Sequence, residues 1–156
     1  MANSQAIANS FKSEVLLGLH QLGSVTLVSR TSLTNPTVDT VKAALYLQSA
    51  TTNGSNATYT ATGEVSGTGY TAGGVTVTNA VAPSTSGSTG IWTPSASIVY
   101  SGVTLPTAFD AVMLYNATQG NRSIGVYTFT AQTISAGTLT LTMPSNDASN
   151  ALLRLA

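Results

Sequence analysis

The chain has 156 residues, the size of one domain, and charged side chains make up only 6% of it, against about 25% in ordinary globular proteins. Five basic and five acidic residues cancel to a formal net charge of zero, which favours association with other protein chains. The scattered cations exclude a nucleic-acid interface, and the apolar runs are far shorter than the ~20 residues that span a bilayer. We therefore expect neither nucleic acid nor a membrane as a partner.

The first segment predicts an amphipathic helix over residues 4–22. Apolar residues recur there at three- and four-residue spacing, which places them on one face of a helix: Ile7, Phe11, Val15, Leu19 and Leu22. Asn3 or Ser4 could cap its start, and Gly23 stands where a helix would end. The helix either covers one end of a β-core, which we favour, or forms an arm that docks on a neighbouring subunit.

From Ser24 onward the sequence predicts strands. Short β-branched or alternating segments recur between joints rich in Gly, Asn, Ser and Pro. The segments are 25–29, 41–48, 75–81, 96–103, 109–116, 123–131, 137–144 and 151–156, and residues 82–90 are expected to form a loop. The pattern predicts a mainly β fold, an antiparallel, jelly-roll-like β-sandwich of about eight strands over residues 24–156, within a single domain of residues 1–156.

Residues 63–74, GEVSGTGYTAGG, raise the question of a phosphate-binding loop. The spacing of Gly67, Gly69 and Gly73 is one residue too long for a dinucleotide fingerprint, and a strand-like segment follows where a helix should start. We interpret the stretch as a connection whose glycines allow a positive φ or a close approach of two backbones. Tyr70 at its centre is either a contact residue or folds back onto its own domain.

Residues that could carry out chemistry are few. There is no cysteine, and His20 is the only histidine, so neither a catalytic triad nor a zinc site is supported. Glu64 and Asp110 are the carboxylates that could form a pair for glycoside cleavage, an interpretation we do not favour. Trp92 is either part of a sugar-binding platform or, as we favour, an anchor in the core. We predict no catalytic residue, no metal and no cofactor.

Several blocks of the chain resemble a family of small structural proteins of tailed bacteriophages. The blocks are QAIANSFKSEVLLGLH, VKAALYLQSA, TYTATGEVSGTGYTAGGVTVTN, AVMLYNATQGNRSIGVYTF and MPSNDASNALLRLA, and they cover most of the sequence. The segment GSVTLVSRTSLTNPTVDT departs from the family pattern by its length. The resemblance implies a virion protein that assembles in the host cytoplasm without a signal sequence.

Within the virion, the role we expect is head decoration by a cement protein on the outer capsid surface. Its partners would then be the major capsid protein and copies of itself, as a dimer or trimer. The interface candidates are Ile7, Phe11, Val15 and Leu19 on the helix face, together with Tyr70 and Trp92. A tail, neck, baseplate or fibre-associated protein remains an alternative, as does a virion module that binds surface glycans.

Overall fold

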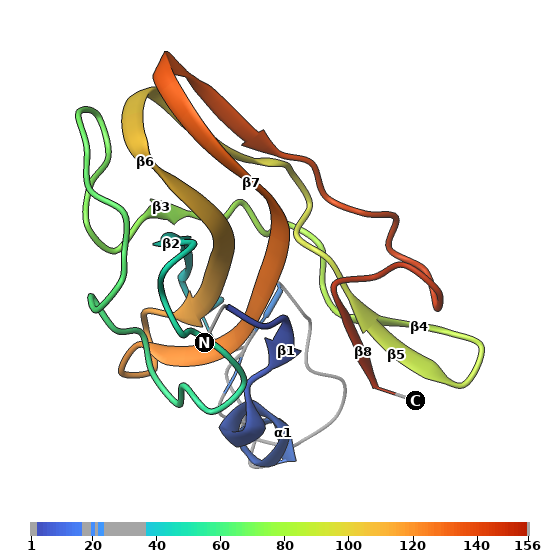
Figure 1. Cartoon of the computed structure of the whole chain (residues 1–156). Coiled ribbons are helices and arrows are strands. Elements are labelled where there is room, and N and C mark those ends of the chain that lie inside the picture. The colour runs from blue at the N-terminus through green and yellow to red at the C-terminus, as the bar shows by residue number, and fades with distance from the viewer. Residues whose placement is uncertain (1–2, 17–19, 21, 24–36, 156) are drawn as a thin grey trace.

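A computed structural model describes residues 3–16, 20, 22–23 and 37–155. These residues form a mainly β protein with eight strands in two antiparallel sheets and one short helix (Figure 1). The strands are β1 (Ala6–Ile7), β2 (Val41–Leu47), β3 (Val75–Thr76), β4 (Ser84–Ser86), β5 (Thr89–Trp92), β6 (Ile98–Asn116), β7 (Arg122–Leu141) and β8 (Leu153–Leu155), and the helix is α1 (Asn9–Leu16). The larger sheet has the order β1-β7-β6-β2-β3, and the smaller has the order β4-β5-β8.

The larger sheet is built around one hairpin of two very long strands. β6 has 19 residues and β7 has 20, so each combines two segments that the sequence predicts as separate strands. Pro106 lies in the middle of β6, where a proline usually interrupts a ladder. The pairing shifts register between Leu105 and Phe109, and this irregularity accommodates the proline without ending the strand.

The β6–β7 hairpin folds back on itself (Figure 1). We call the part in which 109–116 pair with 122–132 the base arm, and the part in which 98–103 pair with 137–141 the returning arm. Several register shifts lie between them, and Ala136 at the bend has a positive φ of 49°. The N–H of Ala136 donates to the hydroxyl of Thr104 over 3.1 Å, which holds the bend.

Both faces of the base arm are buried. The main apolar cluster lies on one face and includes Leu45, Phe109 and Leu114, while Met113 and Tyr46 belong to a smaller cluster. Alternate residues of a strand point to opposite faces, so β2 and β6 can contribute to both clusters. A strand buried on both sides needs a cover on each side, and the connections supply it.

The helix prediction was wrong in extent. Ala6 and Ile7 pair with β7 instead of coiling, and among the described residues the helix α1 spans Asn9–Leu16, while 17–19 and 21 lie outside them. Asn3 caps no helix, because its side chain bonds the carbonyl of Leu47 and both donors of Thr52. The backbone groups of β7 offer these residues hydrogen bonds that a helix would forgo, and this tertiary pairing outweighs the helical pattern.

Two further expectations need correction. Residues 82–90 form most of the β4–β5 hairpin rather than a loop, with Gly87 at a positive φ in its turn, as such turns require. Of the predicted strand 75–81, only Val75 and Thr76 pair. The predicted strand 25–29 lies outside the described residues. No helix in the described part of the chain is long and apolar enough to cross a membrane.

Candidate functional site

The predicted helix face turns toward the protein's own core. Phe11 is only 2% exposed and belongs to the main apolar cluster, and Val15 packs against the same cluster. Ile7 lies half-buried in β1, opposite Gly125 of β7. Leu19 is outside the described residues. The helix therefore covers one end of the β-core, in agreement with the interpretation we favoured, and Phe11 has little surface to offer a partner.

Trp92 is an anchor in the core. Its ring is 2% exposed, and its indole N–H donates to the carbonyl of Leu22 over 3.0 Å and to Asn79 Oδ1 over 3.2 Å. A sugar platform needs an exposed ring face, which Trp92 lacks. The residue instead attaches the smaller sheet to the main apolar cluster.

The glycine-rich stretch lies directly against β6. The N–H of Thr104 donates to the carbonyl of Thr68 over 2.9 Å. A Cβ atom on Gly67 would lie 2.0 Å from the Thr104 carbonyl oxygen, and one on Gly69 would lie 2.3 Å from that of Gly102. Gly69 also has a positive φ. The prediction that glycines serve close approach and positive φ is confirmed.

Glu64 organises this stretch. Its carboxylate accepts hydrogen bonds from the hydroxyls of Tyr59 and Tyr70, each over 2.6 Å, and from the N–H of Gly73 over 2.7 Å. The Tyr70 hydroxyl also accepts the N–H of Leu45 over 3.0 Å. Tyr70 thus folds back onto its own domain.

Asp110 has a different set of contacts. It accepts a hydrogen bond of 2.5 Å from Asn3 Nδ2, whereas Glu64 is held by the tyrosines and Gly73. Retaining and inverting glycosidases need two carboxyl groups facing one substrate bond. The separate partners of Glu64 and Asp110 give no support to such a pair.

All six tyrosine hydroxyls donate to an oxygen of the protein. The acceptors are the carbonyl of Thr60 for Tyr46, the Glu64 carboxylate for Tyr59 and Tyr70, and the carbonyls of Ala43, Gly73 and Leu152 for Tyr100, Tyr115 and Tyr127. Burial raises the pKa of each of them above the ordinary value of 10.0. The hydroxyls therefore act as neutral donors. Those of Tyr46, Tyr115 and Tyr127 join connections to the sheet. The others act within the connection around Glu64 or between β6 and β2.

A buried polar cluster that the sequence analysis missed stabilises the β6–β7 turn. Asn116 is fully buried and donates from Nδ2 to Asp39 over 2.6 Å, and its Nδ2 lies 3.1 Å from Nδ1 of His20. Its side-chain oxygen accepts the N–H groups of Thr118 and Gln119. The short turn after a strand ending in Asn was the available signal, because Asn side chains commonly bond backbone amides two or three residues on.

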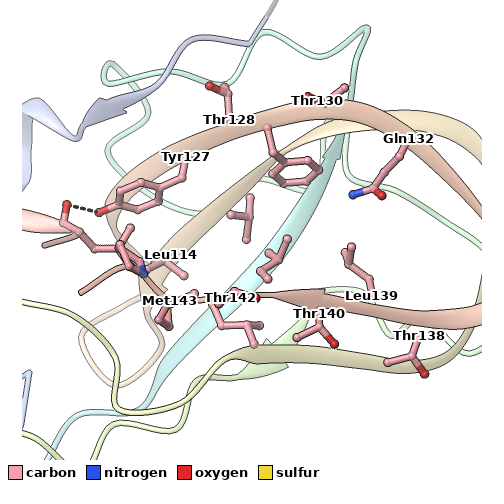
Figure 2. A pocket seen from close by; sticks show the side chains of 16 residues that line it. Leu114, Tyr127, Thr128, Thr130, Gln132, Thr138, Leu139, Thr140, Thr142 and Met143 are labelled. Atoms are coloured by element: carbon pink, nitrogen blue, oxygen red, sulfur yellow. Dashed lines mark hydrogen bonds between the residues drawn. The ribbon is translucent and has the colours of Figure 1, made fainter. Parts of the chain in front are cut away.

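A hollow of about 670 Å³ lies on the concave side of the folded hairpin. Figure 2 shows Thr128 and Thr130 of β7 on one side of it, and Thr138 to Thr140 of β7 with the following Thr142 on the other. Leu139 points into the hollow, whereas Thr138 and Thr140 point away. Further apolar lining residues are Ile98, Val112, Leu114, Phe129, Leu141, Met143 and Leu152.

None of the residues that line this hollow carries a charge. Tyr127 is the one titratable member, and its hydroxyl donates to the Leu152 carbonyl over 3.2 Å, while burial raises its pKa. Within the described ranges, no group of three or more His, Asp or Glu side chains could hold a metal ion. The arrangement suits binding through apolar contact and hydrogen bonds.

The fold and the hollow together define a small, mainly antiparallel β protein with an uncharged hollow. No family model matches its sequence, no curated protein is similar to it, and no solved structure matches its fold.

Proposed function

We propose that this protein is a non-enzymatic virion protein of a tailed bacteriophage, a head decoration or cement protein. It assembles in the host cytoplasm, binds the major capsid protein on the outer surface of the head, and stabilises the shell against the pressure of packaged DNA. The phage assignment is supported by the sequence blocks that resemble phage structural proteins. The structural observation that supports a binding role is the uncharged hollow between the two arms of β7.

The mechanism is one of added interface area. A surface of Ser, Thr, Asn and Gly can associate through hydrogen bonds and apolar contacts, with little desolvation of charge to offset. A ligand that binds one state of an assembly stabilises that state by mass action. A protein that seats across neighbouring subunits of the expanded shell therefore favours that shell, and many copies together need only modest affinity each.

The fixed connections support a mechanical role. Six tyrosine hydroxyls tie connections to the sheet or to one another, and buried hydrogen bonds of this kind rigidify a fold when all partners are satisfied. We also propose that the two sheets form the layers of a jelly-roll-like sandwich. The burial of Ile91, Trp92 and Leu153 in the smaller sheet supports this packing.

Self-association is part of the proposal. A formal net charge of zero leaves no long-range repulsion between copies. We expect a dimer or trimer in solution, which light scattering at concentrations well above micromolar would measure. A strictly monomeric protein under those conditions would contradict this part of the proposal.

Removing the protein from the particle tests the function. Particles without it should release DNA at a lower temperature, or on dilution of salt and magnesium, while adsorbing normally to host cells. Adding back the purified protein should restore the release temperature, and counting copies per head by quantitative mass spectrometry should give hundreds. Unchanged heat stability with lost adsorption would overturn the proposal and assign the protein to the tail.

A further inference from the structure

Among the described residues, most of the outer edge of β7 has no strand beside it. Ala57, Thr58 and β1 cover this edge between Arg122 and Val126. In the described part of the chain, no strand pairs with the outer edge of β7 beyond Val126. The opposite edge of the sheet, β3, has only two residues. Natural proteins usually shorten, charge or cover an edge, because a long one pairs with other chains.

The returning arm has the features of a strand that accepts another strand. Its pairing with β6 is regular from Leu139 to Leu141, so the outer backbone groups there follow a regular strand. Residues 123–146 contain no charged side chain, and thus lack the edge lysines that prevent pairing. Thr138 and Thr140 are exposed, whereas Leu139 is buried toward the hollow.

The chemistry of the hollow defines what can lie beside this edge. Its lining is uncharged and combines threonines with apolar side chains, which include Val112 and Leu114 of β6 and Phe129 of β7. A charged side chain placed there would lose its hydration without gaining a partner. An extended segment with alternating apolar and small polar side chains would bury its apolar side in the hollow. Its backbone would meanwhile bond the free edge.

We propose that the edge Thr138–Met143 and the adjoining hollow bind an extended, uncharged β-strand of another protein chain. The added strand continues the sheet beyond β7, and its apolar side chains contact Phe129 and Leu139. The inference rests on the proposed function only for the source of this strand, which in the particle is a segment of the major capsid protein. The proposed ability to bind a strand rests only on the edge and the hollow described above, and not on the proposed function.

A peptide tests the inference with the isolated protein. The probe is the uncharged peptide acetyl-TVTVNVT-amide, with acetyl-TVTPNVT-amide as a control that cannot complete a ladder. We expect saturable binding of the first peptide and slower hydrogen exchange at the amides of 138–143. Equal binding of the proline peptide, absence of saturable binding, or protection confined to other residues would overturn the inference.

An isosteric pair of variants tests the hollow. Gln132 is exposed and points toward the hollow (Figure 2), so Gln132→Glu adds a charge there without changing shape. Gln48→Glu makes the same change at an exposed site outside the hollow. We expect Gln132→Glu to weaken binding of acetyl-TVTVNVT-amide about tenfold or more, since a buried carboxylate has no partner. Gln48→Glu should bind like the wild type, and equal binding by both variants would overturn the role of the hollow.

The outcomes separate this inference from the proposed function. If the peptide fails to bind while the protein still raises the release temperature of particles, strand addition is wrong and the cement role stands. If the peptide binds as expected while particle stability is unchanged, the cement role is wrong and strand addition stands. Self-association lost in Gln132→Glu, with no peptide binding by the wild type, would overturn the proposed occupant in favour of a second copy.

Discussion

The base arm and the returning arm of the β6–β7 hairpin differ in how far other segments of the chain cover them. On the base arm, β1 and α1 pack on β7. The glycine-rich stretch, which Glu64 and two tyrosine hydroxyls hold together, lies against β2 and against β6 at Gly102 and Thr104. The returning arm has an uncovered outer edge in the described residues and an uncharged hollow beside it. This difference supports our proposal that the uncovered edge of the returning arm receives a partner, while the chain's own segments stabilise the rest of the sheet.

The largest effect should come from breaking the cover at Phe11. Phe11→Asp should leave the protein unfolded, because removing a buried Phe side chain costs about 3–5 kcal/mol and the introduced carboxylate would lose its hydration in the core. Circular dichroism measures this, with Phe11→Leu as a control that should remain folded. A folded Phe11→Asp protein that only associates less well would show that the helix is an arm.

Alkaline solution should act almost as strongly, through the tyrosines. Burial raises the pKa of every tyrosine above 10.0 in the folded protein. The stability linked to these groups is therefore fully present below pH 10 and is lost as the pH rises above it. Tyrosinate absorbance should appear together with the loss of structure. Ionisation of most tyrosines in a protein that keeps its circular dichroism would contradict this.

A smaller effect should follow from forcing the glycine-rich stretch away from β6. Gly67→Ala should cost about 1–3 kcal/mol, as overpacking does, because its Cβ would lie 2.0 Å from the Thr104 carbonyl oxygen. Gly90→Ala is the matched control, since a Cβ there would be 3.7 Å from its nearest neighbour. Denaturant unfolding compares the two. Equal stability would mean that the stretch is not held against β6.

Removing the charge of Glu64 should cost less, about 1 kcal/mol. Glu64→Gln keeps one oxygen as an acceptor but weakens the bonds from Tyr59 and Tyr70, because hydrogen bonds to charged groups are the stronger kind. The free energy of unfolding gives the effect. Asp147→Asn, at a partly exposed carboxylate that bonds Ser149 and Asn150 outside this cluster, provides a comparison. An unchanged stability of Glu64→Gln would show that the charge does not matter.

A substitution in the hollow beside the returning arm should have the smallest effect on the stability of the fold. Gln132→Glu should alter the free energy of unfolding by no more than about 0.5 kcal/mol, as exposed substitutions usually do. The same variant should lose peptide binding. Thermal unfolding of Gln132→Glu beside the wild type measures the first effect, and a loss of several kcal/mol would show that the hollow belongs to the stabilising core.

The sequence predicted the β class because alternation is local. The segment 41–48 became β2 almost residue for residue, and the glycines of 63–74 serve the purposes expected of them. The long strands could not be predicted, because Gly102 and Pro106 signal a break that bulges absorb in the folded chain. The helix was overestimated, since its spacing carries no information about the competing edge of β7.

The hollow was beyond sequence reasoning for another reason. Its lining comes from Ile98, Val112, Leu139 and Leu152, which are distant in the chain and become neighbours only when the hairpin folds back. No local pattern marks such a bend. The threonine alternation in 137–144 predicted a strand but could not reveal that no described segment would pair with its outer edge.

The pairing of β1 with β7 also constrains the order in which the segments of the chain fold. The β6–β7 hairpin closes through the short turn after Asn116, so its pairing begins with a small loss of chain entropy. Ile7 can pair only after Gly125, which lies near the other end of the sequence, has taken its place in β7. On the ribosome, Ile7 therefore leaves early but cannot dock until most of the chain has been made. We expect the hairpin to fold first and the N-terminal segment to close the molecule last.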